Sequence, residues 1–470
     1  MVTRARQPLL PACVAVSIVA SYGLVWFTHR DHRTMLLLGG LLACVVVALL
    51  VVEPFAGLLL LVVTTYLRPG DRFPVLQPLK PALLLAGLTT LVWLVQHIVA
   101  GRPPWARHRL HFWFAALLGT AVVSLVRYGP SLVRQLVGEG PGSSMLLAVL
   151  IANLASTPGR LRAVAWTVTL SCAANAVLAM QALAAGRSGF VGRAAGVGTM
   201  SDPNDLALTL VMVLPLALAL WRGSPRRSSR ALAGLLATLL VAGILTTLSR
   251  GGLLALAVVG LAEVQATVPS PRLRRALTVA AAAAAIIGLN IMFAMRGAGL
   301  ADVSRDPNAV SRKIVWVAGV RMMLNHPVRG VGLYQFGDAF ADYKPRDLDL
   351  PDLTAHNSLI LVLAELGLPG FFVFVSMLLL AREATRRVRR RALAGDLLAV
   401  PGGAAATPLC ESFGRAYLGW FVAAMFLSQA YSNWLYLLLG MVVAADCQLR
   451  RLPAPEVTGS DPVVAKRTAS

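Results

Sequence analysis

The sequence predicts an all-α fold: a polytopic integral membrane helical bundle of about twelve to fourteen transmembrane helices. Of its 470 residues, 57% are hydrophobic and only 14% are charged. Soluble domains contain about 45–50% apolar and about 25% charged residues. Apolar runs of about 20 residues, the length that crosses a bilayer as a helix, recur along the chain. Composition and run length together exclude a soluble globular protein.

The expected helices follow the apolar runs in order. Runs with the length of a full span cover residues 9–27, 35–52, 80–99, 161–184, 204–221, 230–248, 251–268, 275–295 and 357–380. Shorter runs, candidates for tilted or re-entrant helices, cover 55–67, 111–127, 144–155, 414–429 and 431–447. The first run follows the basic start MVTRARQ and resembles a secretory signal, but the many later spans favour a first transmembrane helix.

Arginine clusters set the orientation, because they fall on alternate connections. The clusters contain Arg4 and Arg6, Arg102 to Arg109, Arg160 and Arg162, Arg222 to Arg230, Arg272 to Arg275, Arg382 to Arg391, and Arg450 and Arg451. The positive-inside rule makes their side cytoplasmic, which places both termini in the cytoplasm. Anionic lipid headgroups also account for the formal net charge of +22, so membrane lipids rather than nucleic acid are the expected partners.

Two connections on the opposite side of the membrane carry most of the information. One is the glycine-rich stretch 187–202, and the other is the long polar loop 296–356. Within the long loop, SRKIVWVAGVRMMLNHP has helical apolar spacing and predicts an amphipathic helix along the membrane surface. Pro327 and Gly330 should end this helix.

The motif TLSRGG places Arg250 at the outer end of two expected spans. An arginine there can simply extend its charge to the headgroups. The following glycines, Gly251 and Gly252, favour a second interpretation, a tight turn where backbone approaches an anionic ligand near helix N-terminal amides. Arg312 lies on the expected amphipathic helix. It is either a functional residue that binds an anionic substrate or a solvated residue on the polar face of that helix. Trp316, one turn further on, should anchor that helix at the interface.

His356 and Asn357 stand where the long loop meets the next apolar run. Asn357 or Ser358 can cap that helix, which leaves the histidine unexplained. An imidazole titrates near neutrality and can take a proton from a sugar hydroxyl, so His356 is a candidate base. Glu365, two turns deeper in the apolar run, should pair with a polar group inside the bundle.

Asp202, Asn204 and Asp205 open another apolar run, and Asp-Pro-Asn is mainly a cap and turn signature. This segment shows no paired histidines, thiolate cluster or tight acidic group of the kind that binds divalent ions. We therefore expect no metal and no other cofactor.

Four segments resemble, in their order along the chain, the O-antigen ligase and polymerase family of bacterial membrane glycosyltransferases. They are PNDLAL, TLSRGG, the progression R–W–NHP–GVG–F from Arg312 to Phe336, and HNSLILVLAELGLPG. The resemblance covers about residues 185–380. It implies a GT-C-like helical fold with a periplasmic active site. It also implies an inverting, metal-independent transfer of a glycan from undecaprenyl diphosphate to an acceptor hydroxyl.

The resemblance also assigns residues. Arg250 and Arg312 match the arginines that bind the diphosphate, and His356 matches the histidine thought to deprotonate the acceptor. Arg193 is placed with the diphosphate-binding arginines. Asn204, with Asn357 and Trp316, is placed among the supporting residues. Guanidinium groups can stabilise the charge that develops on a departing diphosphate, so this chemistry needs no metal.

The implied organisation has three parts. Residues 1–160 form N-terminal transmembrane helices, 161–380 form the catalytic core with periplasmic loop 296–356, and 381–470 hold a basic cytoplasmic loop, the last two spans and a tail. Lipid A-core is the favoured acceptor. A second lipid-linked glycan would make the protein a polymerase, and some relatives modify proteins instead. A lipid-linked glycan transporter and a scaffold subunit of an assembly complex stay open as other classes.

Overall fold

A computed structural model describes residues 46–72, 76–101, 106–129, 136, 140–295, 307–345 and 353–452. The described residues are mostly helical and contain no strand, which confirms the all-α fold class. Seven described helices are long and apolar enough to cross a membrane. The chain is therefore a multi-pass membrane protein. The span expected at 9–27 and most of the one at 35–52 lie outside the described residues.

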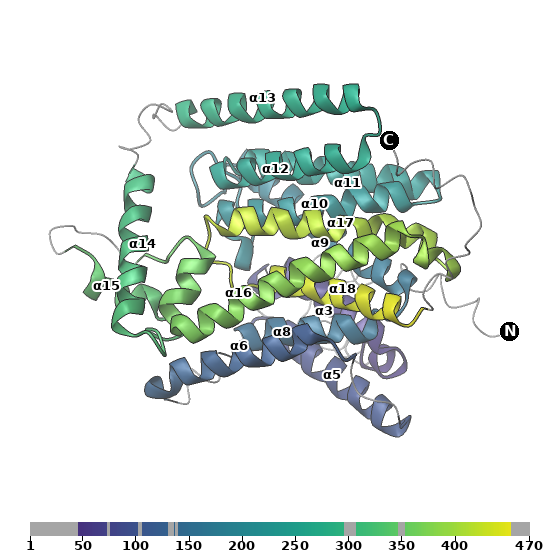
Figure 1. The fold of residues 1–470 in the computed structure, drawn as a ribbon, viewed down its shortest axis with the longest axis horizontal. Helices are drawn as coiled ribbons and strands as arrows, with labels where there is room; N and C mark the ends of the chain where they lie inside the picture. Colours follow the sequence, from purple (N-terminus) through teal and green to yellow (C-terminus); the bar gives the residue numbers. More distant parts are fainter. Residues whose placement is uncertain are drawn as a thin grey trace, which may run out of the picture.

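The long helices run side by side across the view in Figure 1. They are α3 (Pro54–Leu67), α5 (Pro81–Val99), α6 (Arg109–Leu125), α8 (Pro141–Leu154), α9 (Pro158–Ala184), α10 (Pro203–Gly223), α11 (Arg227–Thr246), α12 (Arg250–Thr267), α13 (Pro271–Met295), α16 (Ser358–Leu393), α17 (Gly403–Ala424) and α18 (Asn433–Arg450). Shorter elements are α4 (Pro69–Arg72), α14 (Pro307–Asn325), α15 (Phe336–Tyr343) and the 3₁₀ turns η2 (Val126–Tyr128), η3 (Gly198–Met200) and η5 (Asp396–Ala399).

Helix α10 forms the centre of the bundle, between α9, α11, α12 and α17. Within its apolar window 78% of residues are buried, against 17% in the peripheral helix α5. Proline at its first position suits a helix start, because that residue's missing N–H would have no partner there. The start of α10 is thereby fixed beside several other helix ends.

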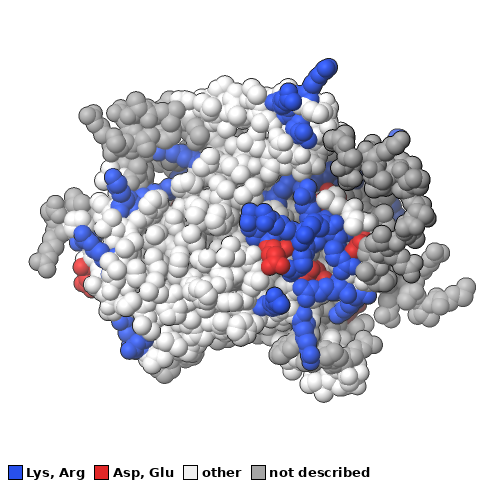
Figure 2. Space-filling model, in the orientation of Figure 1, with Lys and Arg blue, Asp and Glu red and all other residues white. Residues whose placement is uncertain are grey.

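The two ends of the bundle differ. Helix α14 runs across the left-hand ends of the long helices in Figure 1. It ends at Asn325, just before Pro327, so a helix is present where one was expected. Figure 2 shows Lys and Arg side chains, with some Asp and Glu, gathered toward the opposite end. The arginine-rich end and the end that carries α14 are therefore opposite ends of the bundle (Figure 1 and Figure 2).

Helix α16 is broken where the loop after α14 docks against it. Gly367 has φ +66°, and the loop residues Val331 and Gly332 donate their N–H groups to the carbonyls of Ala364 and Glu365 at 2.9 and 3.0 Å. The Glu365 carboxylate accepts from the Phe336 N–H at 3.4 Å, which confirms its expected polar partner. The break provides backbone groups that anchor the segment after α14 to the bundle.

Two expectations about helix ends are wrong. The basic segment from Arg382 to Arg391, expected as a connection, is the continuation of α16. The run expected at 414–429 is displaced, since α17 begins at Gly403 and ends at Ala424. Residues 425–432 are consequently a loop. Arg415, inside α17, forms a buried ion pair with Glu263 at 2.6 Å.

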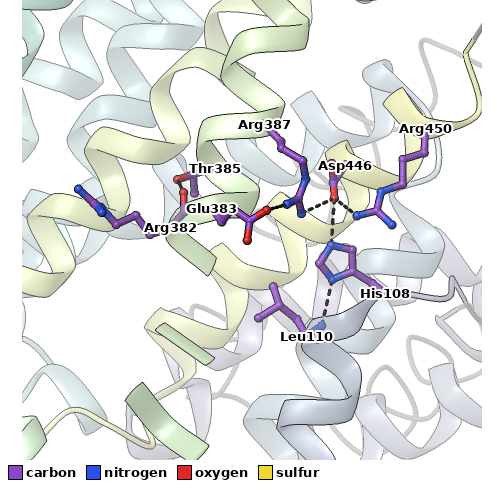
Figure 3. Close-up of polar contacts among 8 residues, drawn as sticks. All are labelled: His108, Leu110, Arg382, Glu383, Thr385, Arg387, Asp446 and Arg450. Carbon is purple, nitrogen blue, oxygen red and sulfur yellow. Dashed lines mark hydrogen bonds and ion pairs between the residues drawn. The ribbon is translucent and has the colours of Figure 1, made fainter. Parts of the chain in front are cut away.

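A second buried ion cluster joins α6, α16 and α18 at the arginine-rich end (Figure 3). The Asp446 carboxylate accepts hydrogen bonds from His108 Nε2 at 3.0 Å, Arg387 Nη2 at 3.2 Å and Arg450 Nη2 at 2.7 Å. His108 also accepts the N–H of Leu110 through Nδ1 and so caps α6. Each hydrogen-bonding position of the imidazole is used, and this cluster has a structural role.

Candidate active site

The predicted site residues gather at the end of the bundle that carries α14. They come from the starts of α10, α12 and α16, from α14 itself, and from the loop before α10. Asp202 caps α10 by accepting the N–H of Asn204 at 2.6 Å, as its cap signature predicts.

Arg193 links the glycine-rich loop to the TLSRGG motif. Its Nη2 donates to Asn204 Oδ1 at 3.0 Å, and its Nε donates to the Thr247 carbonyl at 2.8 Å. The neighbouring Ala194 N–H donates to the Thr246 carbonyl at 2.9 Å. Arg193 and Asn204 are therefore direct partners. Arg193 also contacts Thr247, which lies three residues before Arg250 in the chain.

Arg250 is the first residue of α12 and is half-buried. Ser249 caps the helix by accepting the Gly252 N–H at 3.2 Å. At Gly252 a Cβ would lie 2.5 Å from the Cβ of Ala207 on α10. The close approach that we expected of this glycine is thus made by a neighbouring helix. It brings Arg250 beside the start of α10.

Phe426, in the loop after α17, joins Arg312 to the TLSRGG motif. The Arg312 guanidinium carbon lies 5.6 Å from the centre of the Phe426 ring, within the range of a cation–π contact. On the other side, a Cβ at Gly251 would lie 3.3 Å from the Phe426 Cβ. The segments that carry Arg250 and Arg312 therefore meet at one aromatic side chain.

His356 has an unusual backbone conformation, with φ +46° in the left-handed region. Its N–H donates to Ser428 Oγ at 2.9 Å. Trp316 Nε1 donates to the carbonyl of Ala355, the residue before His356, at 3.1 Å. Trp316 therefore joins α14 to the histidine loop, residues 353–357. These two contacts hold the carbonyl and the N–H of the peptide group that joins Ala355 to His356.

Burial lowers the pKa of His356, and the positive charge of Arg312 lowers it further, while the carboxylate of Asp202 opposes the shift. The imidazole therefore lies within electrostatic reach of both α14 and the start of α10. A lowered pKa keeps the ring neutral at neutral pH, which is the state that accepts a proton.

Asn357 caps α16, because its Oδ1 accepts the N–H groups of Leu359 and Ile360 at 2.9 and 3.1 Å. Its Nδ2 donates to the Met425 carbonyl at 3.1 Å. The capping interpretation of this residue is confirmed.

Three residues of the site were missed from the sequence. Phe426 and Ser428 contact Arg312 and His356, and Gln429 Nε2 donates to Asp205 Oδ1 at 2.6 Å. All three lie in a segment that hydropathy assigned to a helix. Among the residues that the structure describes, no group of three or more His, Cys, Asp or Glu side chains is placed to hold a metal ion.

Comparison with protein families identifies what this region resembles. Residues 235–375 match the family model described as O-antigen ligase. This segment is similar to O-antigen ligases. The family resemblance of the sequence motifs is thereby confirmed over this segment, which contains Arg250, Arg312 and His356. Arg193, Asn204 and the loop after α17 lie outside the matched residues. No curated protein shows a significant match to the chain.

Proposed function

We propose that this chain transfers a glycan from undecaprenyl diphosphate to a hydroxyl of lipid A-core at the periplasmic face of the inner membrane. The observation that carries the proposal is the convergence of Arg250, Arg312 and His356 at one end of the bundle, inside the segment that matches the O-antigen ligase family. A membrane-embedded site at that end suits a donor whose lipid lies in the bilayer and whose glycan extends outward.

The two arginines bind the diphosphate of the donor. As the glycan leaves, negative charge grows on the departing oxygen, and fixed guanidinium groups stabilise it without having to reorganise. The Arg312 guanidinium lies 5.6 Å from the centre of the Phe426 ring, and a guanidinium can bind phosphate oxygens through paired N–H groups. Arg193 contributes positive charge at the start of α10, where it is tied to Asn204.

His356 takes the proton of the acceptor hydroxyl. The acceptor oxygen forms a bond to the anomeric carbon while the bond from that carbon to the diphosphate oxygen breaks. The proton passes to the neutral imidazole, and the diphosphate leaves with the electron pair. One base and in-line attack suffice for this reaction, and they invert the anomeric centre.

The test is to incubate the purified full-length protein with lipid-linked oligosaccharide, with and without lipid A-core. The proposal predicts glycan on lipid A-core with the wild-type protein and none with His356→Ala. Longer lipid-linked chains in the absence of lipid A-core would replace the ligase by a polymerase that uses the same residues. No transfer to either acceptor by well-folded protein would contradict the proposal and leave transport or a scaffold role.

A further inference from the structure

The loop after α17 is hydrogen-bonded to the histidine loop almost residue by residue. Five hydrogen bonds join residues 354–358 to residues 425–429. Two of them involve Ser358, whose hydroxyl donates to the Leu427 carbonyl at 2.7 Å and accepts the Gln429 N–H at 3.0 Å. This set of contacts holds the two loops together at the open end of the bundle.

Ser428 is the central residue of this contact. Its Oγ accepts the His356 N–H at 2.9 Å and the Thr354 hydroxyl at 2.8 Å. His356 has no glycine-like freedom, so a φ of +46° must be maintained by its surroundings. The Ser428 hydroxyl accepts the hydrogen bond from the backbone N–H of His356 and so holds this strained residue in place.

Phe426 makes the corresponding contact with Arg312. Its ring lies beneath the guanidinium, while Gly251 leaves room for the same ring on the side of α12. A larger residue than glycine at 251 would press on Phe426. The aromatic ring therefore sets the distance between the two segments that carry the arginines.

We infer that residues 425–429 are a positioning element of the active site, in which Ser428 fixes His356 and Phe426 fixes Arg312. This inference rests on the proposed function for the roles of His356 and Arg312. It adds a part of the chain that begins 50 residues beyond the end of the matched O-antigen ligase domain. In this inference the loop acts through these two side chains, which it contacts directly.

Carbethoxylation of His356 by diethylpyrocarbonate tests the role of Ser428 without any catalytic assay. The rate is measured by peptide mass spectrometry on the purified full chain at about pH 8, where an imidazole is neutral and the rate reports exposure. Loss of the hydrogen bond in Ser428→Ala should raise the rate about 2- to 10-fold. Ser428→Thr keeps the hydroxyl and should react like the wild type. An unchanged rate in Ser428→Ala would overturn the inference.

A matched control is Ser143→Ala, at the start of α8. The Ser143 hydroxyl donates to the Gly140 carbonyl at 2.8 Å within its own turn. The same deletion of one oxygen should there leave the His356 rate unchanged. A rate increase as large as that of Ser428→Ala would mean a general loosening of the fold and would also overturn the inference.

A double-mutant cycle adds the catalytic readout. Ser428→Ala should lower kcat about 2- to 10-fold in the wild type, because the base is misplaced. In a His356→Ala background it should have no further effect. An equal loss in both backgrounds would show that Ser428 does not act through His356. Absence of transfer by the wild type would instead remove the proposed function, while the labelling experiment would still test the positioning.

Phe426 is tested through the donor. Phe426→Leu should raise the KM for lipid-linked donor more than it lowers kcat, whereas Phe426→Tyr keeps the ring and should restore the wild-type KM. An unchanged donor KM in Phe426→Leu would overturn the assignment of this residue.

Discussion

A single methyl group at Gly252 should separate the start of α12 from α10 and displace Arg250. The Cβ of Gly252→Ala would lie 2.5 Å from the Ala207 Cβ, where ordinary contacts begin at 3.4 Å, so the helices must part by about 1 Å. Such overpacking costs about 1–3 kcal/mol, and the better helix propensity of alanine recovers about 1 kcal/mol. The fold should survive this change.

Activity should not survive it to the same extent. A misplacement of about 1 Å at a reacting centre lowers rates by about 100-fold. We therefore expect transfer of glycan to lipid A-core by Gly252→Ala to fall about 100-fold, with a small change in Tm. Gly260→Ala is the matched control in the same helix, since no atom lies within 4 Å of its Cβ. It should keep full activity. A wild-type transfer rate in Gly252→Ala would refute the claim that α10 and α12 together set the position of Arg250.

Three further predictions concern charge and orientation. Arg312→Gln removes a positive charge that lowers the His356 pKa, so this pKa should rise. Asp202→Asn can still cap α10 but removes the opposing carboxylate, so the His356 pKa should fall. The pH dependence of His356 carbethoxylation measures both shifts, and shifts of the same sign would contradict the assigned neighbours. Arg415→Met leaves Glu263, whose side chain is 9% exposed, with Arg222 as its remaining arginine partner, and should lower the free energy of unfolding by about 3 kcal/mol. Arg450→Met removes a side chain that is 48% exposed and should lower it by about 0–1 kcal/mol; thermal unfolding measures both losses. Equal losses would place the Glu263 pair in solvent. In a cysteine-free background, Val191→Cys should react with an impermeant maleimide added to intact spheroplasts, and Leu398→Cys only after lysis; the reverse pattern would invert the topology.

Hydropathy predicted most of the helices because apolar length is a direct requirement of the bilayer. The expected short runs at 55–67 and 144–155 are α3 and α8, at nearly the expected bounds. The start of α17 was missed because Thr407, Pro408 and the pair Glu411–Ser412 interrupt its apolar pattern. The ion pair of Arg415 with Glu263, which is 152 residues away in sequence, was not expected either. Partners at that separation cannot be read from a local pattern.

The candidate site divides in the same way. His356, Arg250 and Arg312 stood out because ionisable groups at the ends of membrane helices are few and expensive. Phe426 and Ser428 carry no such signal, since an aromatic residue and a serine at a helix end are common. The hydrogen bond from His356 to Ser428 joins positions 72 residues apart. Only the packing of α16 against α17 brings them together.

The central claim is that a periplasm-facing cluster of arginines and one histidine moves a glycan from a lipid diphosphate to an acceptor. Its most direct test compares wild-type, His356→Ala and Arg312→Ala proteins, purified and equally folded, on the same lipid-linked oligosaccharide with lipid A-core. We predict glycosylated lipid A-core from the wild type and a loss of product from both variants. Product from His356→Ala at the wild-type rate would contradict the claim.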